Sequence, residues 1–351
     1  MMESGQSEKP VAASVKSQSL DVFDPMGQRI WEYVSQSPLR NLWDFEGASV
    51  KLVFQRTLKS FLDDNLLSRA AELGYFFLFA LFPTLVSASA ILGLAARSAS
   101  QIYVQLLNYL ALVIPASAFA IVVETFNQTT AAATSGKVTL GIVAALWSAS
   151  VGFSAIQDGM NTVYRVRETR PYWKARGSAI LVTMLLSVLV TLNLAVLLAG
   201  DFTARYALRH LWHHWLGMTA AVVLHTISWV AGSGFLILLF ATIYYFAPDL
   251  KVKRWRWLSP GAAIGILGWL AASIGLRVYL HFFNNFSLTY GSLGAVIILL
   301  TWFYITGLML LAGAEINSEI AAAVVEKRLK EQGTLPPEAT TDPEHPIVGV
   351  V

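Results

Sequence analysis

The sequence predicts an all-α fold: a polytopic bundle of six transmembrane helices, preceded by an amphipathic helix. The composition is 55% hydrophobic and 13% charged, whereas an ordinary soluble domain is about 25% charged. Long apolar stretches alternate with connections whose Lys and Arg content switches between high and nearly nil. We expect three regions: a polar, disordered N-terminal extension over residues 1–46, a membrane domain over 47–320 and a disordered cytoplasmic tail over 327–351.

An amphipathic helix is expected just before the first span. Its apolar residues recur at helical spacing, with basic and polar residues on the other side: Val50, Val53, Phe54, Leu58, Phe61 and Leu62. Such a helix suits the cytoplasmic membrane interface. A soluble helix packed on the cytoplasmic loops is the alternative, and the short length leaves both open.

Six stretches are long and apolar enough to cross a membrane. A helix that rises about 1.5 Å per residue needs about 20 mostly apolar residues to cross roughly 30 Å of hydrocarbon. The predicted spans cover residues 71–95, 138–158, 178–199, 218–246, 259–280 and 292–314.

A seventh apolar stretch, Tyr103 to Val123, contains Pro115 at its middle. With six crossings, the basic clusters, including those at 165–176 and 251–256, all lie on one side. A seventh crossing would put the first basic cluster opposite the later ones, against the positive-inside bias. We therefore expect this stretch to be a Pro-interrupted, non-crossing element, interfacial or re-entrant, and both termini to be cytoplasmic.

Small residues line one side of the second and fifth spans, at spacings of four and three. A period near 3.5 keeps such a seam facing one neighbour, and small residues let two backbones approach closely. The seams could be sliding surfaces or tight static contacts. In either case we expect helix packing at Gly141, Gly152, Gly261, Gly265 and Gly268.

Ionisable side chains at the spans are the first candidates for a site. A charge at membrane depth costs roughly 3 kcal/mol on insertion scales and tends to face the bundle interior. Glu72, Asp158 and Glu315 lie at the predicted cytoplasmic ends of three spans, so they share one depth. They could take up a proton or cation, or hold Arg165 and Arg69 in ion pairs; alternatively, they are ordinary interface charges. From its angle to the small-residue seam, we expect Asp158 to point into the bundle.

Three further polar residues are candidates for transport or gating. Asn161 and Asn317 lie close in sequence to the carboxylates, and Arg277 lies near the outer end of the fifth span. Arg277 either lines a cavity or extends its head group to the interface. The sequence has no Walker loop, nucleophile elbow, H-E-x-x-H motif or dinucleotide fingerprint. We therefore predict no catalytic residue, metal site, cofactor or nucleic-acid partner.

Short motifs follow one another in a set order along the chain. They are Gly74-Tyr75-Phe76 through Phe82-Pro83, Asp158-x-x-Asn161-x-x-Tyr164-x-Val166, Tyr244-Tyr245-Phe246-Ala247-Pro248, Pro260-Gly261-Ala262, Tyr290-Gly291-Ser292-Leu293-Gly294 and Gly313-Ala314-Glu315-Ile316-Asn317. Over about residues 50–320 this set resembles the YihY/BrkB family of bacterial inner-membrane proteins. The resemblance implies six spans with cytoplasmic termini, in agreement with the charge count.

The resemblance also implies a transporter-like or flippase-like protein that exports an envelope lipid or a small solute, with membrane lipids as partners. The rival is a membrane scaffold that binds envelope-assembly partners through its basic loops, without transport or catalysis. An intramembrane enzyme is the third alternative. The family's older ribonuclease label has no support here, because a histidine-rich metallohydrolase motif and an acidic two-metal cluster are both missing from the sequence. The substrate and the oligomeric state do not follow from the sequence.

Overall fold

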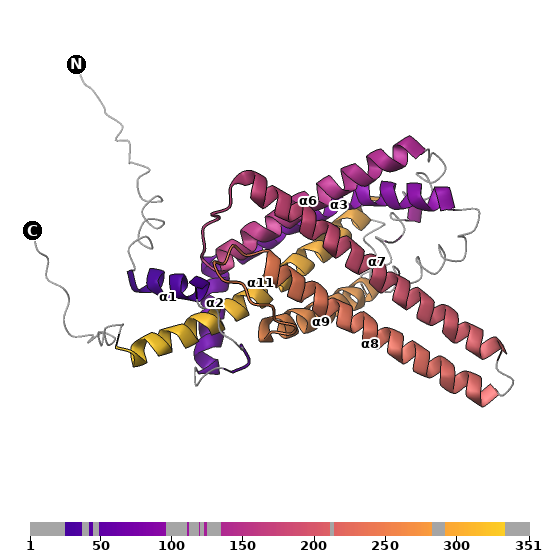
Figure 1. Ribbon diagram of the computed structural model, residues 1–351. Helices are drawn as coiled ribbons and strands as arrows, with labels where there is room; N and C mark the ends of the chain where they lie inside the picture. Colours follow the sequence, from indigo (N-terminus) through magenta and orange to yellow (C-terminus); the bar gives the residue numbers. More distant parts are fainter. Residues whose placement is uncertain are drawn as a thin grey trace, which may run out of the picture.

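In the computed structural model, every element with described bounds is an α-helix (Figure 1). The structure describes residues 25–36, 42–44, 49–95, 135–210, 214–282 and 292–333, with a few single positions between 111 and 124. The all-α prediction is confirmed for this part of the chain. Apart from those single positions, the predicted non-crossing element at 103–123 lies outside the described residues.

Each predicted span is matched by a long helix, and α7 and α11 extend well beyond the predicted bounds. The helices are α1 (Pro25–Gln36), α2 (Val50–Asp63), α3 (Leu66–Ala95), α6 (Ser135–Val163), α7 (Tyr172–His210), α8 (His214–Phe246), α9 (Pro260–Phe282) and α11 (Ser292–Glu331). Within the described residues, five of them, α6, α7, α8, α9 and α11, are long and apolar enough to cross a membrane. They match predicted spans two to six. Helix α3 covers the first predicted span, whose crossing stays a prediction.

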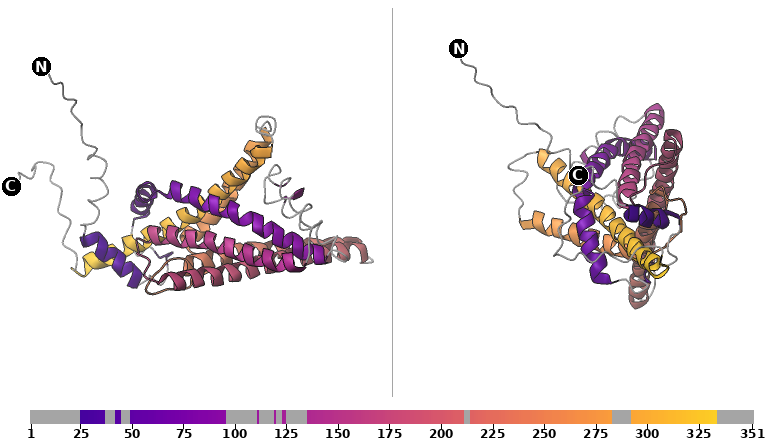
Figure 2. Two further views of the ribbon diagram at one scale, coloured as in Figure 1. Left: turned by 90° about the horizontal axis from the view of Figure 1, so that it is seen from above. Right: turned by 90° about the vertical axis from the view of Figure 1, so that its left-hand side faces the viewer.

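Helix α11 is the centre of the bundle. It packs along α3 and α9 and also contacts α6, α2 and α1 (Figures 1 and 2). Glycines bring the backbones of α3 and α11 close together: a Cβ added at Gly74 would lie 3.1 Å from the Tyr304 amide nitrogen, and one added at Gly307 would lie 2.9 Å from the Leu73 Cβ. Two long apolar helices thus meet almost backbone to backbone, as membrane helices do where small residues line the contact.

The main apolar core joins α3, α6, α8, α9 and α11. Leu73, Met160, Phe240, Ile266 and Leu311, one from each of these helices, are buried in it, and α7 adds Ala179 and Val182 to it. The outer surfaces of the long helices are also apolar, and many large hydrophobic side chains on them are exposed. A surface of this kind is expected where lipid, and not water, is the surrounding solvent. The far halves of α7 and α8 form an antiparallel pair that extends beyond the other helices (Figure 1).

One end of the bundle carries the basic connections, and we call it the basic end. Helices α3, α7 and α9 begin there, and α6, α8 and α11 end there. The connections at 164–171 and 247–259 belong to it, and it is the side that the charge pattern predicts to be cytoplasmic.

The basic end carries a second, smaller apolar core, which we call the platform. It is formed by α1, α2 and the last turns of α11, and it buries Ile30, Val34, Val53, Ile320 and Val324. The helical part of the N-terminal extension was expected to be disordered. Instead, an apolar stripe within this mostly polar segment packs on α11, and that contact gives α1 a reason to fold.

Helix α11 also continues five residues into the segment predicted as a disordered tail, to Glu331. Near its end, Arg56 Nη1 of α2 donates a hydrogen bond of 2.6 Å to Glu326 Oε2. Helix α2 buries Val53 against α11 and leaves Phe54 and Leu58 exposed. It is therefore both packed on the protein and amphipathic on its outer side.

Candidate functional site

Glu315 is fully buried in α11 without the partners that a buried carboxyl group normally has. Its relative exposure is 0%, and neither of its carboxyl oxygens has a hydrogen-bond partner in the described part of the chain. Buried polar groups are nearly always hydrogen-bonded, because an unsatisfied one costs about 1–3 kcal/mol and a charged one costs more. In a membrane protein, such a costly ionisable group is by default a candidate functional residue.

Three charged side chains from separate segments act on Glu315: Asp64 between α2 and α3, Glu319 one turn further along α11, and Arg165 after α6. Arg165 Nη2 lies 3.8 Å from Asp64 Oδ2 and 3.6 Å from Glu319 Oε1. Ser60 Oγ donates to Glu319 Oε1 at 2.8 Å and accepts from Arg165 Nη2 at 2.9 Å. We call Asp64, Glu315, Glu319 and Arg165 the acidic cluster.

A strained turn brings Arg165 to this cluster. Its φ is +51°, and the amide of Arg165 donates to Thr162 O while that of Val166 donates to Asn161 O, both at 2.9 Å. This is the Schellman end of a helix, where the left-handed residue is usually glycine. A side chain in that conformation costs about 1–2 kcal/mol. The chain keeps a guanidinium at this position, and that guanidinium also lies over the Trp31 ring, 4.7 Å from its centroid.

The pKa of Asp64 is raised in this cluster. Burial raises the pKa of the Asp64 carboxyl, and the charge of Glu319 raises it further, while Arg165 opposes both. Asp64 Oδ2 is buried and accepts no hydrogen bond within the described residues. The described residues contain no group of three or more His, Cys, Asp or Glu side chains that could hold a metal ion.

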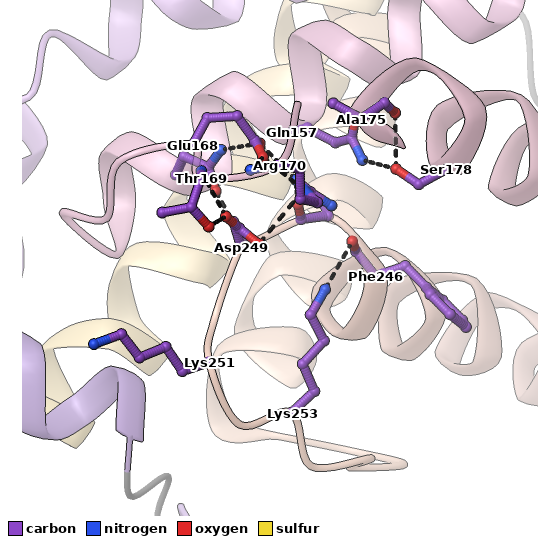
Figure 3. A network of polar contacts seen from close by, with 12 residues as sticks. Gln157, Glu168, Thr169, Arg170, Ala175, Ser178, Phe246, Asp249, Lys251 and Lys253 are labelled. Atoms are coloured by element: carbon purple, nitrogen blue, oxygen red, sulfur yellow. Dashed lines mark hydrogen bonds and ion pairs between the residues drawn. The ribbon is translucent and has the colours of Figure 1, made fainter. Parts of the chain in front are cut away.

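A second polar network, which we call the clamp, ties the loop after α6 to the loop after α8 (Figure 3). Arg170 Nε and Nη2 donate to the two carboxyl oxygens of Glu168, both at 2.6 Å. Asn161 Nδ2 donates to Glu168 Oε2 at 2.9 Å, and Asn161 Oδ1 accepts from the Asp249 amide at 2.8 Å. The Thr169 amide and hydroxyl donate to Asp249 Oδ2 at 2.8 and 2.6 Å.

The clamp holds its carboxyl groups in the ionised form. Hydrogen bonds from Arg170 lower the pKa of Glu168. Burial acts to raise the pKa of Asp249, but the hydrogen bonds from Thr169 and the charge of Arg170 outweigh it, so this pKa is lowered as well. The end of α6, the start of α7 and the end of α8 are therefore connected to one another by charge-assisted hydrogen bonds.

Asn317 has a structural role at the start of α9. Its Oδ1 accepts from the Gly261 amide at 2.9 Å, and its Nδ2 donates to Ser259 Oγ at 2.8 Å. A helix start leaves backbone amides without partners, and here a side chain of α11 provides the acceptor for one of these amides. At the same contact, a Cβ at Gly261 would collide with the Gly313 carbonyl oxygen.

Three further glycines of the two seams, Gly152, Gly265 and Gly268, also lie against neighbouring helices. A Cβ at Gly265 would lie 3.0 Å from Met309 O, and one at Gly268 would lie 2.8 Å from Met309 Sδ. Gly152 faces α3 at ordinary contact distance, 3.8 Å from Phe76, and Gly141 is buried. The fifth span therefore packs tightly on α11, and the second packs more loosely on α3.

The remaining predicted site residues are exposed. Glu72, Arg277 and Asp158 all lie on exposed sides of their helices. For Asp158 this corrects the expectation that it points into the bundle: its neighbours Gln157 and Gly159 are buried and occupy the inner face of α6. Each residue turns about 100° around a helix, so Asp158 rotates outward when both neighbours face inward.

The structure therefore brings together only part of the predicted set. Glu315 and Asn317 lie 2 positions apart on α11, and Asn161 joins the clamp. Glu72 and the clamp residues Glu168 and Arg170 act electrostatically on Asp158. The sequence reasoning missed Asp64, Glu319 and Asp249. Glu319 had a detectable signal, because it follows Glu315 by four residues and so shares its face.

Comparison with known proteins identifies the family of the chain. A sequence model of the family described as virulence factor BrkB matches residues 57–336. Ribonuclease-like protein YfkH of Bacillus subtilis (strain 168) is 35% identical over 271 residues, which cover 75% of this chain and 91% of YfkH. Membrane protein YihY of Salmonella typhimurium is 29% identical over 191 residues, which cover 51% of this chain and 57% of YihY.

A membrane protein of Xanthomonas oryzae pv. oryzae is 28% identical over 273 residues, 75% of this chain and 59% of that protein. No solved structure matches the chain. The family match covers well over half of the chain, and the relatives named as membrane proteins agree with the apolar helices of the structure. The chain therefore belongs to the YihY/BrkB family of integral membrane proteins.

Proposed function

We propose that this protein moves a lipid or a small solute of the cell envelope across the bacterial inner membrane, with both termini in the cytoplasm. The observation that carries the proposal is Glu315, fully buried with both carboxyl oxygens unpartnered within the described residues. A bundle that only had to stay folded would gain by replacing such a group with an apolar one. Ionisable residues that persist inside membrane bundles mark paths for substrates or ions.

The surroundings of Glu315 support the same proposal. Asn317, Ser318 and Glu319 are also buried, so more than one turn of α11 presents polar groups to the interior of the protein. This polar stretch lies at the basic end, where the positive-inside bias predicts the cytoplasm. In the proposed function, groups at that depth would meet a substrate that enters from the cytoplasmic side.

The experiment uses the full-length protein reconstituted into liposomes that contain phospholipids with a fluorophore on the head group. Dithionite bleaches only the outer leaflet, so a protein that moves lipid increases the bleached fraction. Glu315→Gln keeps the shape of the side chain and removes its charge, and Glu331→Gln is the matched control at the exposed end of α11. We expect activity in the wild type and in E331Q, and its loss in E315Q.

The solute branch is tested in parallel. The same liposomes, loaded with a mixture of sugars and amino acids, are analysed by mass spectrometry for wild-type-dependent release. If the wild type moves neither lipid nor solute, the transport proposal is wrong. If E315Q matches the wild type in both assays, Glu315 does not support it.

The scaffold is the second candidate, and the platform favours it. Helices α1 and α2 build a folded apolar core on the end of α11, at the end of the bundle that carries the basic loops. A scaffold would tolerate E315Q in living cells and would fail when the platform is disrupted, as by Val34→Asp. A transporter would show the opposite order of sensitivity. Ribonuclease activity, which the name of YfkH suggests for that relative, is not part of either proposal.

A further inference from the structure

The acidic cluster carries more negative than positive charge. Asp64, Glu315 and Glu319 contribute three carboxyl groups, and Arg165 is the cation that acts on Glu315. Arg69 also acts on Asp64 and lowers the pKa of that carboxyl, but it is not among the charges that act on Glu315. If all three carboxyl groups were ionised, Glu315 and Glu319 would therefore share Arg165 in a buried place. An ionisable group in the protein interior is normally either paired with an opposite charge or held in its neutral form.

Hydrogen bonds do not resolve this imbalance. Ser60 donates to Glu319, and Arg165 lies within 4 Å of both Asp64 and Glu319. The oxygens of Glu315 receive no donor from the described residues. The Arg165 guanidinium thus forms its ion pairs with Asp64 and Glu319, and not with Glu315.

Within the described residues, Tyr164 is a further titratable group that interacts with Glu315, and it supplies no charge. Tyr164, in the turn after α6, is coupled electrostatically to Glu315, and burial raises the pKa of its phenol to about 12. The phenol is therefore neutral in the physiological range. Arg256 acts on Tyr164 and opposes this rise; it is not among the charges that act on Glu315.

We propose that the acidic cluster is a proton-binding site, in which Glu315 exchanges a proton with the solution at the basic end. The proton adds to a carboxylate oxygen and leaves a neutral carboxylic acid, while Arg165 keeps its charge and its ion pairs with Asp64 and Glu319. When the proton leaves to water, the Glu315 anion competes for the same guanidinium. A proton fits this place because it needs one oxygen atom, whereas a metal ion needs a cage that the described residues do not form.

This inference rests on the proposed transport function for its purpose, since the proton would be the coupling ion. Its first test does not require transport. Infrared difference spectroscopy of the purified protein, titrated with acid and base, detects the C=O stretch of a protonated carboxyl group. We expect a titrating band in the wild type and in E331Q that is missing in E315Q.

The Arg165→Ala variant keeps Glu315 and provides a second test, the pH midpoint of the same infrared band. Removal of a neighbouring cation favours the protonated form, so the midpoint of the band should move to higher pH, by about 1 to 3 units. That shift corresponds to a tenfold to thousandfold higher proton affinity. Arg165→Lys keeps the charge and should leave the midpoint near that of the wild type. This arm keeps the test valid if E315Q fails to fold, which size-exclusion chromatography would reveal.

Sodium ions distinguish a proton site from a site for a metal cation. Addition of sodium at constant pH should leave the band unchanged; its loss would show that the site takes a metal cation and would overturn the proposal. A wild-type spectrum without a band that depends on Glu315 or shifts in R165A would also overturn it. In the liposome assay, a pH gradient should change the wild-type transport rate. Transport without the band refutes the proton site alone, and the band without transport refutes the proposed function alone.

Discussion

The contact between α9 and α11 allows a stringent test of the packing, by Gly261→Ala with Gly275→Ala as its matched control. A Cβ at Gly261 would collide with the Gly313 carbonyl oxygen and lie 2.7 Å from the Asn317 side chain, whereas a Cβ at Gly275, further along the same helix, meets nothing within 4 Å. The first change must push two backbones apart and disturb the hydrogen bond from the Gly261 amide to Asn317. The second adds a methyl group to open space.

The magnitudes follow from these contacts. Overpacking costs about 1–3 kcal/mol and a lost hydrogen bond costs about 1 kcal/mol, so G261A should lose about 2–4 kcal/mol. G275A should gain about 0.5–1 kcal/mol, because alanine restricts the unfolded chain more than glycine does. The two variants should therefore differ by about 2.5–5 kcal/mol. At about 2–4 °C per kcal/mol, the value for domains of about 150–250 residues, their apparent melting temperatures in detergent should differ by roughly 5–20 °C. A G261A protein that melts at or above G275A would show that this interface is not close-packed.

Three further predictions follow from the charged residues and the topology. Single cysteines at Lys174 and His213 in this cysteine-free chain should label from opposite sides of the membrane, and labelling from one side would contradict the six-span topology. Stability in detergent should fall as the pH drops below about 4, because the pKa values of Glu168 and Asp249 are lowered in the folded protein: their stabilisation is complete above the unfolded values and is lost as the pH falls through the folded ones. Replacing both by their amides should flatten this acid limb of the stability curve, and an unchanged limb would exclude the clamp as its cause. Arg165→Gly should be more stable than Arg165→Ala by about 1 kcal/mol, since both lose the guanidinium and only glycine relieves the positive φ; equal stabilities would contradict a strained turn.

The positions of the long helices could be predicted from the sequence because the membrane imposes a local rule. A span needs a continuous apolar length, and that length can be counted along the chain. Helix α9, predicted over 259–280, is observed at Pro260–Phe282, within two residues at each end. The family was predictable for a related reason, since its motifs are short, ordered and local.

The directions of the side chains were harder to predict. A shift of one residue turns a side chain by about 100°, so a small error in the assumed phase of α6 moved Asp158 from the inside to the outside. Long-range partners leave even less local trace. The contact of Ser60 with Glu319 joins residues 259 positions apart, and α1 is fixed by an apolar surface on α11 that its own polar neighbourhood does not reveal.

The turn from Asn161 to Val166 connects the two polar networks of the basic end. Its backbone closes α6 through the hydrogen bond from the Val166 amide to Asn161 O, while the Asn161 side chain belongs to the clamp. Arg165 lies between these two residues and reaches into the acidic cluster. In the proposed proton cycle, a movement of the guanidinium toward Glu315 would therefore strain the same turn that holds the ends of α6, α7 and α8 together. A strained residue at such a junction is the kind of element whose conformation two sites can influence at once. Through it, protonation of Glu315 on α11 could affect the positions of α7 and α8.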